Sequence, residues 1–401
     1  MKNTGKLLKR LLTASLSSAL SFSMCACSEQ NIENPAFFDS DVAGIDHIIE
    51  FPEGKDITIL QLTDTQAMLY EGIRTEFYDN YGNKYEDFNR FNQVHGAFFT
   101  SGVTDTYTRV WQYVEEAVEK TTPDLIVLTG DNIYGETDDS GKLWLEMIEV
   151  LDSFEIPWLC IFGNHDNESN KGLHWQIEAV SASKYGYMQE GICQNGNSNY
   201  TVGIKQDQEI KYVFYMLDTN GCRLKPHNFG ESLLPYNPDL DDIQQNDGIF
   251  PDQMEWMRDS YSKISAQVGN VPSMIFMHIP PVETYYSVAE SYPETYGTWP
   301  FYTDKDGDIG MATENIGGFD SNGEFFKTAK EINCAGIFMG HQHKVATSTM
   351  YDGIRLTYGL KTGTGDYHDP EMLGSTKITI KEADNTFEVE HIHSEIEYPL
   401  S

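Results

Sequence analysis

Residues 158–166 read WLCIFGNHD, an apolar run that ends in glycine, asparagine, histidine and aspartate. A short run rich in β-branched or aromatic residues, bounded by a turn-forming Gly-Asn pair, predicts a buried strand. In open sheets of strands and helices, ligands bind at the carboxyl ends of the strands. Asn164, His165 and Asp166 therefore stand where a binding site is expected.

Four other apolar runs, at 57–62, 125–128, 274–277 and 336–339, end in the same kind of residue. They lead respectively into Asp64 and Gln66, into Asp131, into His278, and into His341 and His343. Helical patterns lie between several of these runs, and such alternation is typical of sheets covered by helices. These patterns fall at 106–120, 142–154, 250–264 and 323–332. The sequence thus predicts that polar side chains from five strand ends meet around one point.

The residue types at these strand ends are those that hold metal ions. Carboxylate and amide oxygens together with imidazoles suit Zn, Mn or Fe, and no thiolate belongs to the set. Any one of the short motifs has a plain interpretation as a turn or a helix cap. Five such motifs at successive strand ends favour a metal centre. Two ions that share a bridging ligand can hold a phosphoryl group during its displacement.

The motifs resemble, in order and spacing, those of the calcineurin-like metallophosphoesterase superfamily. They are Asp64-Thr65-Gln66, Gly130-Asp131, Gly163-Asn164-His165-Asp166, His278-Ile279-Pro280 and Gly340-His341-Gln342-His343. The run YGLKTG at 358–363 looks like the purple-acid-phosphatase-related branch that contains the yeast-Dcr-type phosphatases. The resemblance implies an α/β fold, a four-layer α/β/β/α sandwich of two mixed sheets, in a metallophosphoesterase domain at 56–395.

The same resemblance implies a role for each residue. Two metal ions, of Fe, Zn or Mn, would be held by seven side chains: Asp64, Gln66, His343 and a bridging Asp131 at the first position, and Asn164, His278 and His341, with the same Asp131, at the second. His165 would donate a proton to the departing oxygen, and Asp166 would orient its ring. A hydroxide that bridges the ions would attack phosphorus, so that no covalent phosphoenzyme forms.

Position 66 departs from the pattern of many relatives, which have histidine there. A glutamine oxygen can coordinate, but it binds first-row ions less tightly than imidazole does. Tyr134 lies three residues after Asp131, where purple acid phosphatases carry a metal-binding tyrosinate. It is a second candidate ligand, and the alternative is that it forms part of the pocket wall.

We predict a hydrolase of phosphate monoesters that acts on a small phosphorylated substrate. A phosphodiesterase or nucleotide hydrolase with the same dinuclear centre is the alternative within the same class. A non-catalytic surface-binding lipoprotein with a decayed site is the alternative of another class, and only Gln66 favours it. With 62 Asp and Glu against 27 Lys and Arg, the formal charge is −35, which argues against nucleic-acid polymers as partners. The oligomeric state is not indicated.

The first residues predict export. A basic start at 2–10 and an apolar or small-residue run at 11–24 are typical of a signal peptide, here 1–26. Cys27 after Ala26 resembles a lipidation site, which implies a lipoprotein on the surface of a bacterial cell and membrane contact only through that anchor. Without lipid, the protein would be secreted. Residues 27–55 are expected to be a tether. Export permits a disulfide between Cys193 and Cys222, although the sequence leaves that pairing open.

Overall fold

A computed structural model of the chain describes residues 38–67, 77–78, 84–85, 103–135, 141–169, 171–221, 247–292, 301–303 and 308–396. The signal peptide at 1–26 and Cys27 lie outside these residues, so export and lipid attachment stay predictions. Cys222 lies outside them too; Cys193 forms no disulfide within the described part of the chain. None of the helices in these ranges is both long enough and apolar enough to cross a bilayer.

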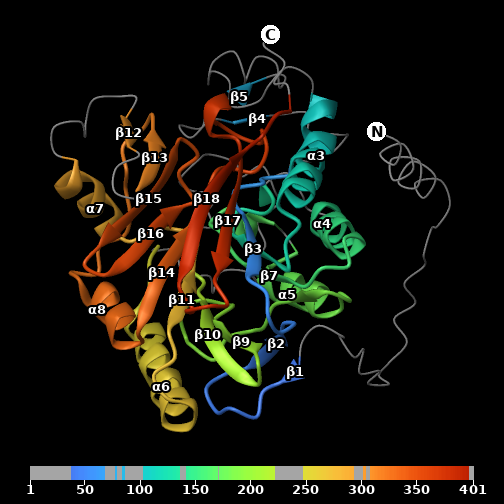
Figure 1. Cartoon of the computed structure of the whole chain (residues 1–401). Coiled ribbons are helices and arrows are strands. Elements are labelled where there is room, and N and C mark those ends of the chain that lie inside the picture. Colours follow the sequence, from blue (N-terminus) through green and yellow to red (C-terminus); the bar gives the residue numbers. More distant parts are fainter. Residues whose placement is uncertain are drawn as a thin grey trace. The chain divides into compact units, whose positions relative to one another are not determined.

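Two mixed sheets form the centre of the fold (Figure 1). The six-stranded sheet has the order β18 (Phe387–His393), β17 (Gly374–Ile380), β3 (Ile57–Leu62), β6 (Leu125–Thr129), β7 (Trp158–Ile161) and β8 (Gly186–Tyr187). The ten-stranded sheet has the order β1 (Phe38–Asp39), β2 (His47–Glu50), β9 (Tyr200–Gln206), β10 (Glu209–Met216), β11 (Ser273–Phe276), β14 (Cys334–Met339), β16 (Ile354–Tyr358), β15 (Val345–Tyr351), β13 (Ile309–Ala312) and β12 (Phe301–Thr303). A separate two-stranded antiparallel sheet consists of β4 (Phe77–Tyr78) and β5 (Lys84–Tyr85).

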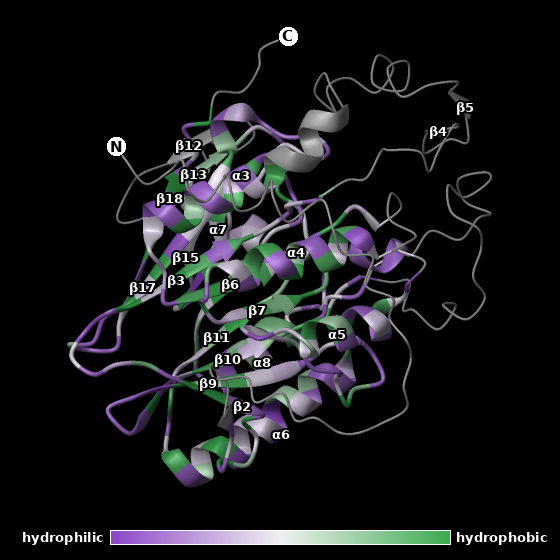
Figure 2. Cartoon of the chain, turned by 90° about the vertical axis from the view of Figure 1, so that its right-hand side faces the viewer, coloured by the Kyte–Doolittle hydropathy of each residue, from purple (hydrophilic) through white to green (hydrophobic). Residues whose placement is uncertain are grey.

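Helices cover the outer faces of the two sheets. The six-stranded sheet carries α3 (Val103–Thr121), α4 (Lys142–Ser153) and α5 (Leu173–Ser181), and the ten-stranded sheet carries α6 (Pro251–Val268), α7 (Glu283–Ser291) and α8 (Glu324–Glu331). Two short 3₁₀ turns, η2 (Asp166–Glu168) and η4 (Pro370–Met372), complete the helical elements described. Figure 2 shows the apolar residues of the sheets and of the helix faces gathered in the interior.

Alternating side chains of the ten-stranded sheet belong to two cores. Phe214 and Phe276 join the core that also holds Ile59 and Ile378 of the six-stranded sheet. Tyr215 and Ile275, one position along, join the core under α6, α7 and α8. Because successive side chains of a strand point to opposite faces, one sheet face meets the other sheet and the opposite face meets helices. The predicted α/β class and the four-layer sandwich are therefore confirmed.

The N-terminal part of the domain begins earlier than the sequence suggested. β2 pairs in parallel with β9, and Ile48 and Ile49 are buried. These residues lie inside the segment 27–55, so the expectation that all of it is a tether is wrong from residue 38 onward. A four-residue strand gives too short an apolar run to stand out without its partner strand.

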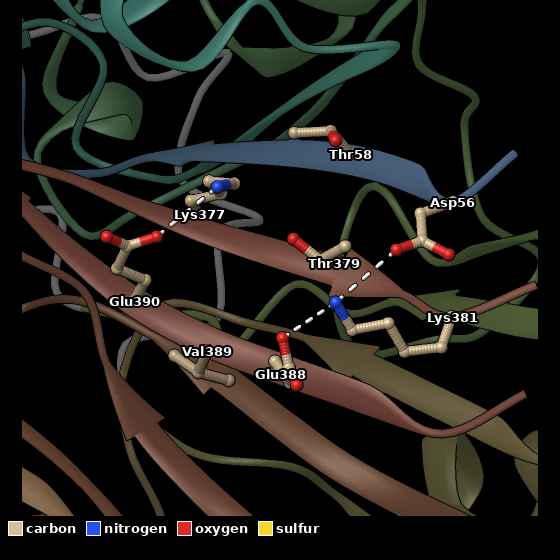
Figure 3. A pocket seen from close by; sticks show the side chains of 8 residues that line it. All are labelled: Asp56, Thr58, Lys377, Thr379, Lys381, Glu388, Val389 and Glu390. Atoms are coloured by element: carbon tan, nitrogen blue, oxygen red, sulfur yellow. Dashed lines mark hydrogen bonds and ion pairs between the residues drawn. The ribbon is translucent and has the colours of Figure 1, made fainter.

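No helix in the described part of the chain lies over one strip of the six-stranded sheet. On the outward face of β17 and β18, Lys377 pairs with Glu390 at 3.3 Å, and Lys381 pairs with Glu388 at 2.7 Å and with Asp56 at 3.3 Å (Figure 3). We call these five side chains the surface ladder. Charged cross-strand pairs suit an exposed sheet edge, because they discourage pairing with another chain.

Candidate metal centre

The loops after β3 and β6 hold the two central carboxylates. Asp64 and Asp131 are each 1% exposed and adopt positive φ angles of 52° and 50°. Aspartate tolerates this left-handed region better than most residues do. The Asp64 backbone N–H donates to the Gly130 carbonyl at 3.1 Å, which ties the two loops together. Gly130 is required there, since a Cβ would come within 2.8 Å of the His278 ring.

Asp64, Asp131 and His343 form the first group of ligand atoms. One atom from each lies within 4.8 Å of the others, and all three residues are buried. His343 Nε2 is 3.3 Å from Asp64 Oδ1, and its Nδ1 lies 2.7 Å from the Tyr367 carbonyl oxygen. A carbonyl partner makes Nδ1 the donor, so Nε2 of the neutral ring is free to bind a metal ion.

His278 and His341 form the second group together with Asn164. His278 Nδ1 donates to the Thr129 carbonyl at 2.9 Å, and its Nε2 lies 3.2 Å from Asp131 Oδ2. His341 Nδ1 is 2.9 Å from Asn164 Oδ1, and the two histidine rings meet edge to face at 5.2 Å. The structure thus brings together the six side chains that the sequence placed at five strand ends.

This donor set fits metal ions. His278 is fully buried, and within the described residues the Asp131 carboxylate is the one group that its Nε2 faces at close range. A buried imidazole nitrogen beside a shared carboxylate is well placed to bind a metal ion. Burial alone raises the pKa of Asp64 and of Asp131, but nearby histidines outweigh burial and lower both pKa values below the usual range. Two buried carboxylates that stay ionised beside imidazole nitrogens suit a divalent cation.

The histidines of the centre differ in their tendency to hold a proton. Burial lowers the pKa of His278, but Asp131 more than compensates and raises the pKa to about 9. His341 is dominated by burial, which lowers its pKa to about 4. His341 is therefore neutral and ready to coordinate near pH 7.

His165 lies at the open side of this cluster, with 22% of its side chain exposed. Its backbone N–H donates to Asp131 Oδ1 at 2.8 Å, and its ring stacks on Tyr134 with centroids 4.5 Å apart. Tyr134 thus forms part of the wall beside His165, which agrees with the pocket interpretation; its role as a ligand stays untested.

Glu168, not Asp166, orients the His165 ring. His165 Nδ1 lies 2.8 Å from Glu168 Oε2, and that carboxylate raises the pKa of His165 against the effect of burial. Asp166 instead accepts from the backbone N–H groups of Ile133 and Gly163, at 3.0 and 2.7 Å. The role expected for Asp166 is therefore wrong. The 3₁₀ turn η2 explains the exchange, because residues three apart lie above one another in such a turn.

Gln66 is buried beside the first group, but its oxygen is already engaged. Gln66 Nε2 is 3.3 Å from Asp131 Oδ2, and Gln66 Oε1 accepts from Lys361 Nζ at 2.8 Å. Lys361 also donates to the Asp64 carbonyl at 2.6 Å and is 2% exposed. Burial lowers its pKa to about 8, opposed by Asp64, Asp366 and Asp131.

Two residues at the centre were missed by sequence reasoning. Glu168 follows His165 by three residues, a spacing that could have been noticed beside a predicted turn. Tyr367 stacks on His343 with centroids 4.1 Å apart, and the sequence carries no signal for that contact.

Several site residues have backbone angles that non-glycine residues seldom adopt. Of the fourteen such residues with positive φ in the described ranges, five belong to this centre. They are Asp64, Gln66, Asp131, His341 and Asp366. Backbone strain of this kind gathers at functional sites, where surrounding contacts hold it in place.

Comparisons with known proteins point to one family. A model of the calcineurin-like phosphoesterase family matches residues 57–345. The chain is 25% identical over 312 residues to the phosphatase DCR2 of Saccharomyces cerevisiae, which covers 75% of this chain and 46% of that protein. It is 42% identical over 267 residues to a protein of Arabidopsis thaliana named probable inactive purple acid phosphatase 28, covering 65% of this chain and 63% of the relative.

The chain thus spans 46% and 63% of the length of these two relatives. Among solved structures, it is similar to a dimetal phosphatase from Danio rerio, with a TM-score of 0.43, 13% identity, and 80% of this chain and 92% of the other covered. The relatives are those that the sequence motifs led us to expect, from the yeast-Dcr-type and purple-acid-phosphatase-like branch.

Proposed function

The chain belongs to the calcineurin-like phosphoesterase family, and we propose that it hydrolyses phosphate monoesters with a pair of metal ions. The single observation that carries this proposal is the position of His165. It is partly exposed at the edge of a buried cluster of carboxylates and imidazoles, and its backbone is bonded to Asp131. A proton donor beside a cation cluster is what departure of an alkoxide from phosphorus requires.

The residues present would divide between two positions. Asp64, Asp131 and His343 would hold the first ion, and Asn164, His278 and His341, with Asp131 again, the second. Bound there, the ions would neutralise the phosphate oxygens and lower the pKa of a water molecule. Metal identity is not fixed by these donors, which suit Zn, Mn or Fe.

His165 would act as the general acid. Glu168 holds Nδ1, which leaves Nε2 as the ring nitrogen that can deliver a proton to the leaving oxygen. The raised pKa of His165 supports a protonated ring near neutral pH. Tyr134 would keep the ring from turning, because the two planes stack with an interplanar angle of 20°.

A small monoester is the substrate class that the charge favours. The net charge of −35 repels long polyanions, so a nucleic-acid polymer is disfavoured, whereas a small phosphate needs only the local cations of the centre. We propose further that the protein works outside the cytoplasm, anchored through Cys27.

A second candidate follows from the Arabidopsis thaliana relative, which is named a probable inactive purple acid phosphatase. A binder with a decayed site would keep the fold without turnover. The presence of His165 and of the six clustered side chains argues against that interpretation, and metal content together with turnover decides it.

The test combines elemental analysis of the purified protein with assays of a nitrophenyl monoester and its bis-ester. We expect two ions per chain, activity lost on chelation and restored by metal, and faster hydrolysis of the monoester. His165→Ala should keep both ions and slow turnover by about 10²–10⁴-fold. Full activity of this variant on a poor leaving group would exclude the acid role, and faster cleavage of the bis-ester would favour the phosphodiesterase.

A further inference from the structure

A buried lysine, Lys361, lies beside the first of the two proposed metal positions. Lys361 has two oxygen acceptors in the described structure, Gln66 Oε1 at 2.8 Å and the Asp64 carbonyl at 2.6 Å. At 2% exposure, its ammonium group has almost no access to bulk water. Both acceptors belong to the loop after β3 that also supplies Asp64 to the first position.

The lysine fixes which way the Gln66 amide points. An ammonium group only donates, so it needs the oxygen of the amide, and the NH₂ group is then directed to Asp131 Oδ2 at 3.3 Å. Turning the amide over would place two donors against each other at Lys361 and two acceptors against each other at Asp131. The hydrogen-bond network therefore permits only one orientation.

We infer that Lys361 acts as a clamp at the first metal position: it holds Gln66 Oε1, so that Gln66 is not a ligand, and its charge weakens this position relative to the second. The first position keeps Asp64, Asp131 and His343. The second keeps Asp131 and three further donors, Asn164, His278 and His341. This inference rests on the proposed pair of metal ions and extends it to their order of binding.

The clamp acts through charge as well as through ligand number. The ammonium group touches the backbone of Asp64, so a divalent ion at the first position meets a fixed positive charge nearby. In the dry interior such repulsion is screened far less than in water. The first position consequently fills last and empties first.

The experiment titrates metal-free protein with Mn²⁺, using calorimetry for affinity and electron paramagnetic resonance for pairing of the ions. For the natural sequence we expect two binding phases whose dissociation constants differ by at least about tenfold. The spin-coupled signal of an ion pair should arise only in the weaker phase. A single phase with two equal sites would overturn the inference while leaving the proposed function intact.

Two variants separate the parts of the clamp. Lys361→Met removes the charge, frees the Gln66 oxygen, and should tighten the weaker phase on the order of tenfold. Gln66→Leu removes the amide and should change neither phase by more than about threefold, because a non-ligand can be lost without losing the ion. If Gln66→Leu abolishes the weaker phase, Gln66 is a ligand and the inference fails.

Lys377→Met is the matched control. It removes an identical charge from the surface ladder on β17, where the side chain is 31% exposed, and should leave both phases unchanged. Should Lys361→Met fail to fold, Gln66→Leu alone still decides whether the amide binds metal. Absence of any Mn²⁺ binding by the natural sequence would instead contradict the proposed function itself.

Discussion

Strand β17 joins two regions that use charge in opposite ways. Where β17 begins, Leu373 forms a backbone bridge with Lys361, whose charge is buried at the centre. Along its outward face, Lys377 and Lys381 pair with carboxylates of the surface ladder in contact with water (Figure 3). Burying a charge is costly unless it is paired, whereas surface pairs contribute little. A charge in the first region is therefore informative about function, and a charge in the second is not.

The largest effect is expected at the carboxylate shared by both metal positions. Asp131→Asn keeps the shape of the side chain but removes its negative charge beside His278. Both metal affinity and turnover should fall by about 100-fold or more. Even a substitution of a residue that only hydrogen-bonds to a metal ligand lowers affinity or activity about 10–100-fold. Elemental analysis and a nitrophenyl phosphate assay measure this. Retention of two ions would show that the buried region tolerates charge loss as the surface does.

A smaller effect is expected from crowding the same region without touching any charge. A Cβ on Gly340 would overlap Thr63 Oγ1 and Asp64 Oδ2, so Gly340→Ala must displace the Asp64 carboxylate. We expect a loss of about 1–3 kcal/mol in unfolding free energy, as for overpacked cores, and weaker binding of the first ion. Denaturant unfolding and metal titration measure the two.

Gly317→Ala is the control for that substitution. A Cβ on Gly317 comes no closer than 3.7 Å to Gln342, which is ordinary contact. This variant should match the natural protein in both assays. If both variants lost the same stability and metal affinity, the effect of Gly340→Ala would not depend on its contact with Asp64.

A more selective effect is expected at Glu168. Glu168→Gln keeps a hydrogen-bond acceptor for His165 Nδ1 but loses the charge that favours a protonated ring. Turnover should fall roughly tenfold for an alkyl phosphate and much less for a nitrophenyl phosphate, because only the poor leaving group needs the proton. Asp166→Asn should instead lower stability and affect both substrates alike, since Asp166 serves the backbone. An equal effect of Glu168→Gln on both substrates would contradict its positioning role.

The smallest effect is expected on the surface ladder. Lys377→Met breaks the pair with Glu390 but leaves β17 and its buried face in place. The melting temperature should change by less than about 2 °C, as is usual for exposed pairs. Scanning calorimetry measures this. A loss as large as that of Gly340→Ala would remove the contrast between the two regions.

Most of the fold could be predicted from the sequence because its strands are continuous apolar runs. The run at 57–62 became β3 with the same bounds. Helices α5 and α7 were not predicted. α7 lies in a segment rich in tyrosine, glycine and proline, where loop-forming composition hides a short helix.

The centre was predictable in part, for a physical reason. Asp64 and Asp131 follow neighbouring parallel strands of one sheet, whose carboxyl ends converge, so these two could be brought together without knowing any distance. His278 follows β11 of the other sheet, and its approach depends on how the two sheets pack. The contact between Lys361 and Gln66 joins residues 295 positions apart, and no periodicity or local motif encodes it. Glu168 rather than Asp166 contacts the His165 ring because of the pitch of one 3₁₀ turn, and the amino-acid sequence alone does not reveal that turn.

The positive φ angles at the centre limit how the stability of this protein can be raised by mutation. They occur at Asp64, Gln66, Asp131, His341 and Asp366. Replacements that relax these residues would gain stability but disturb the geometry of the candidate metal centre, so higher thermal stability has to be sought at other positions. Solvent-facing helix positions offer that freedom. In this protein, stability can therefore be raised at residues other than those that form the candidate metal centre.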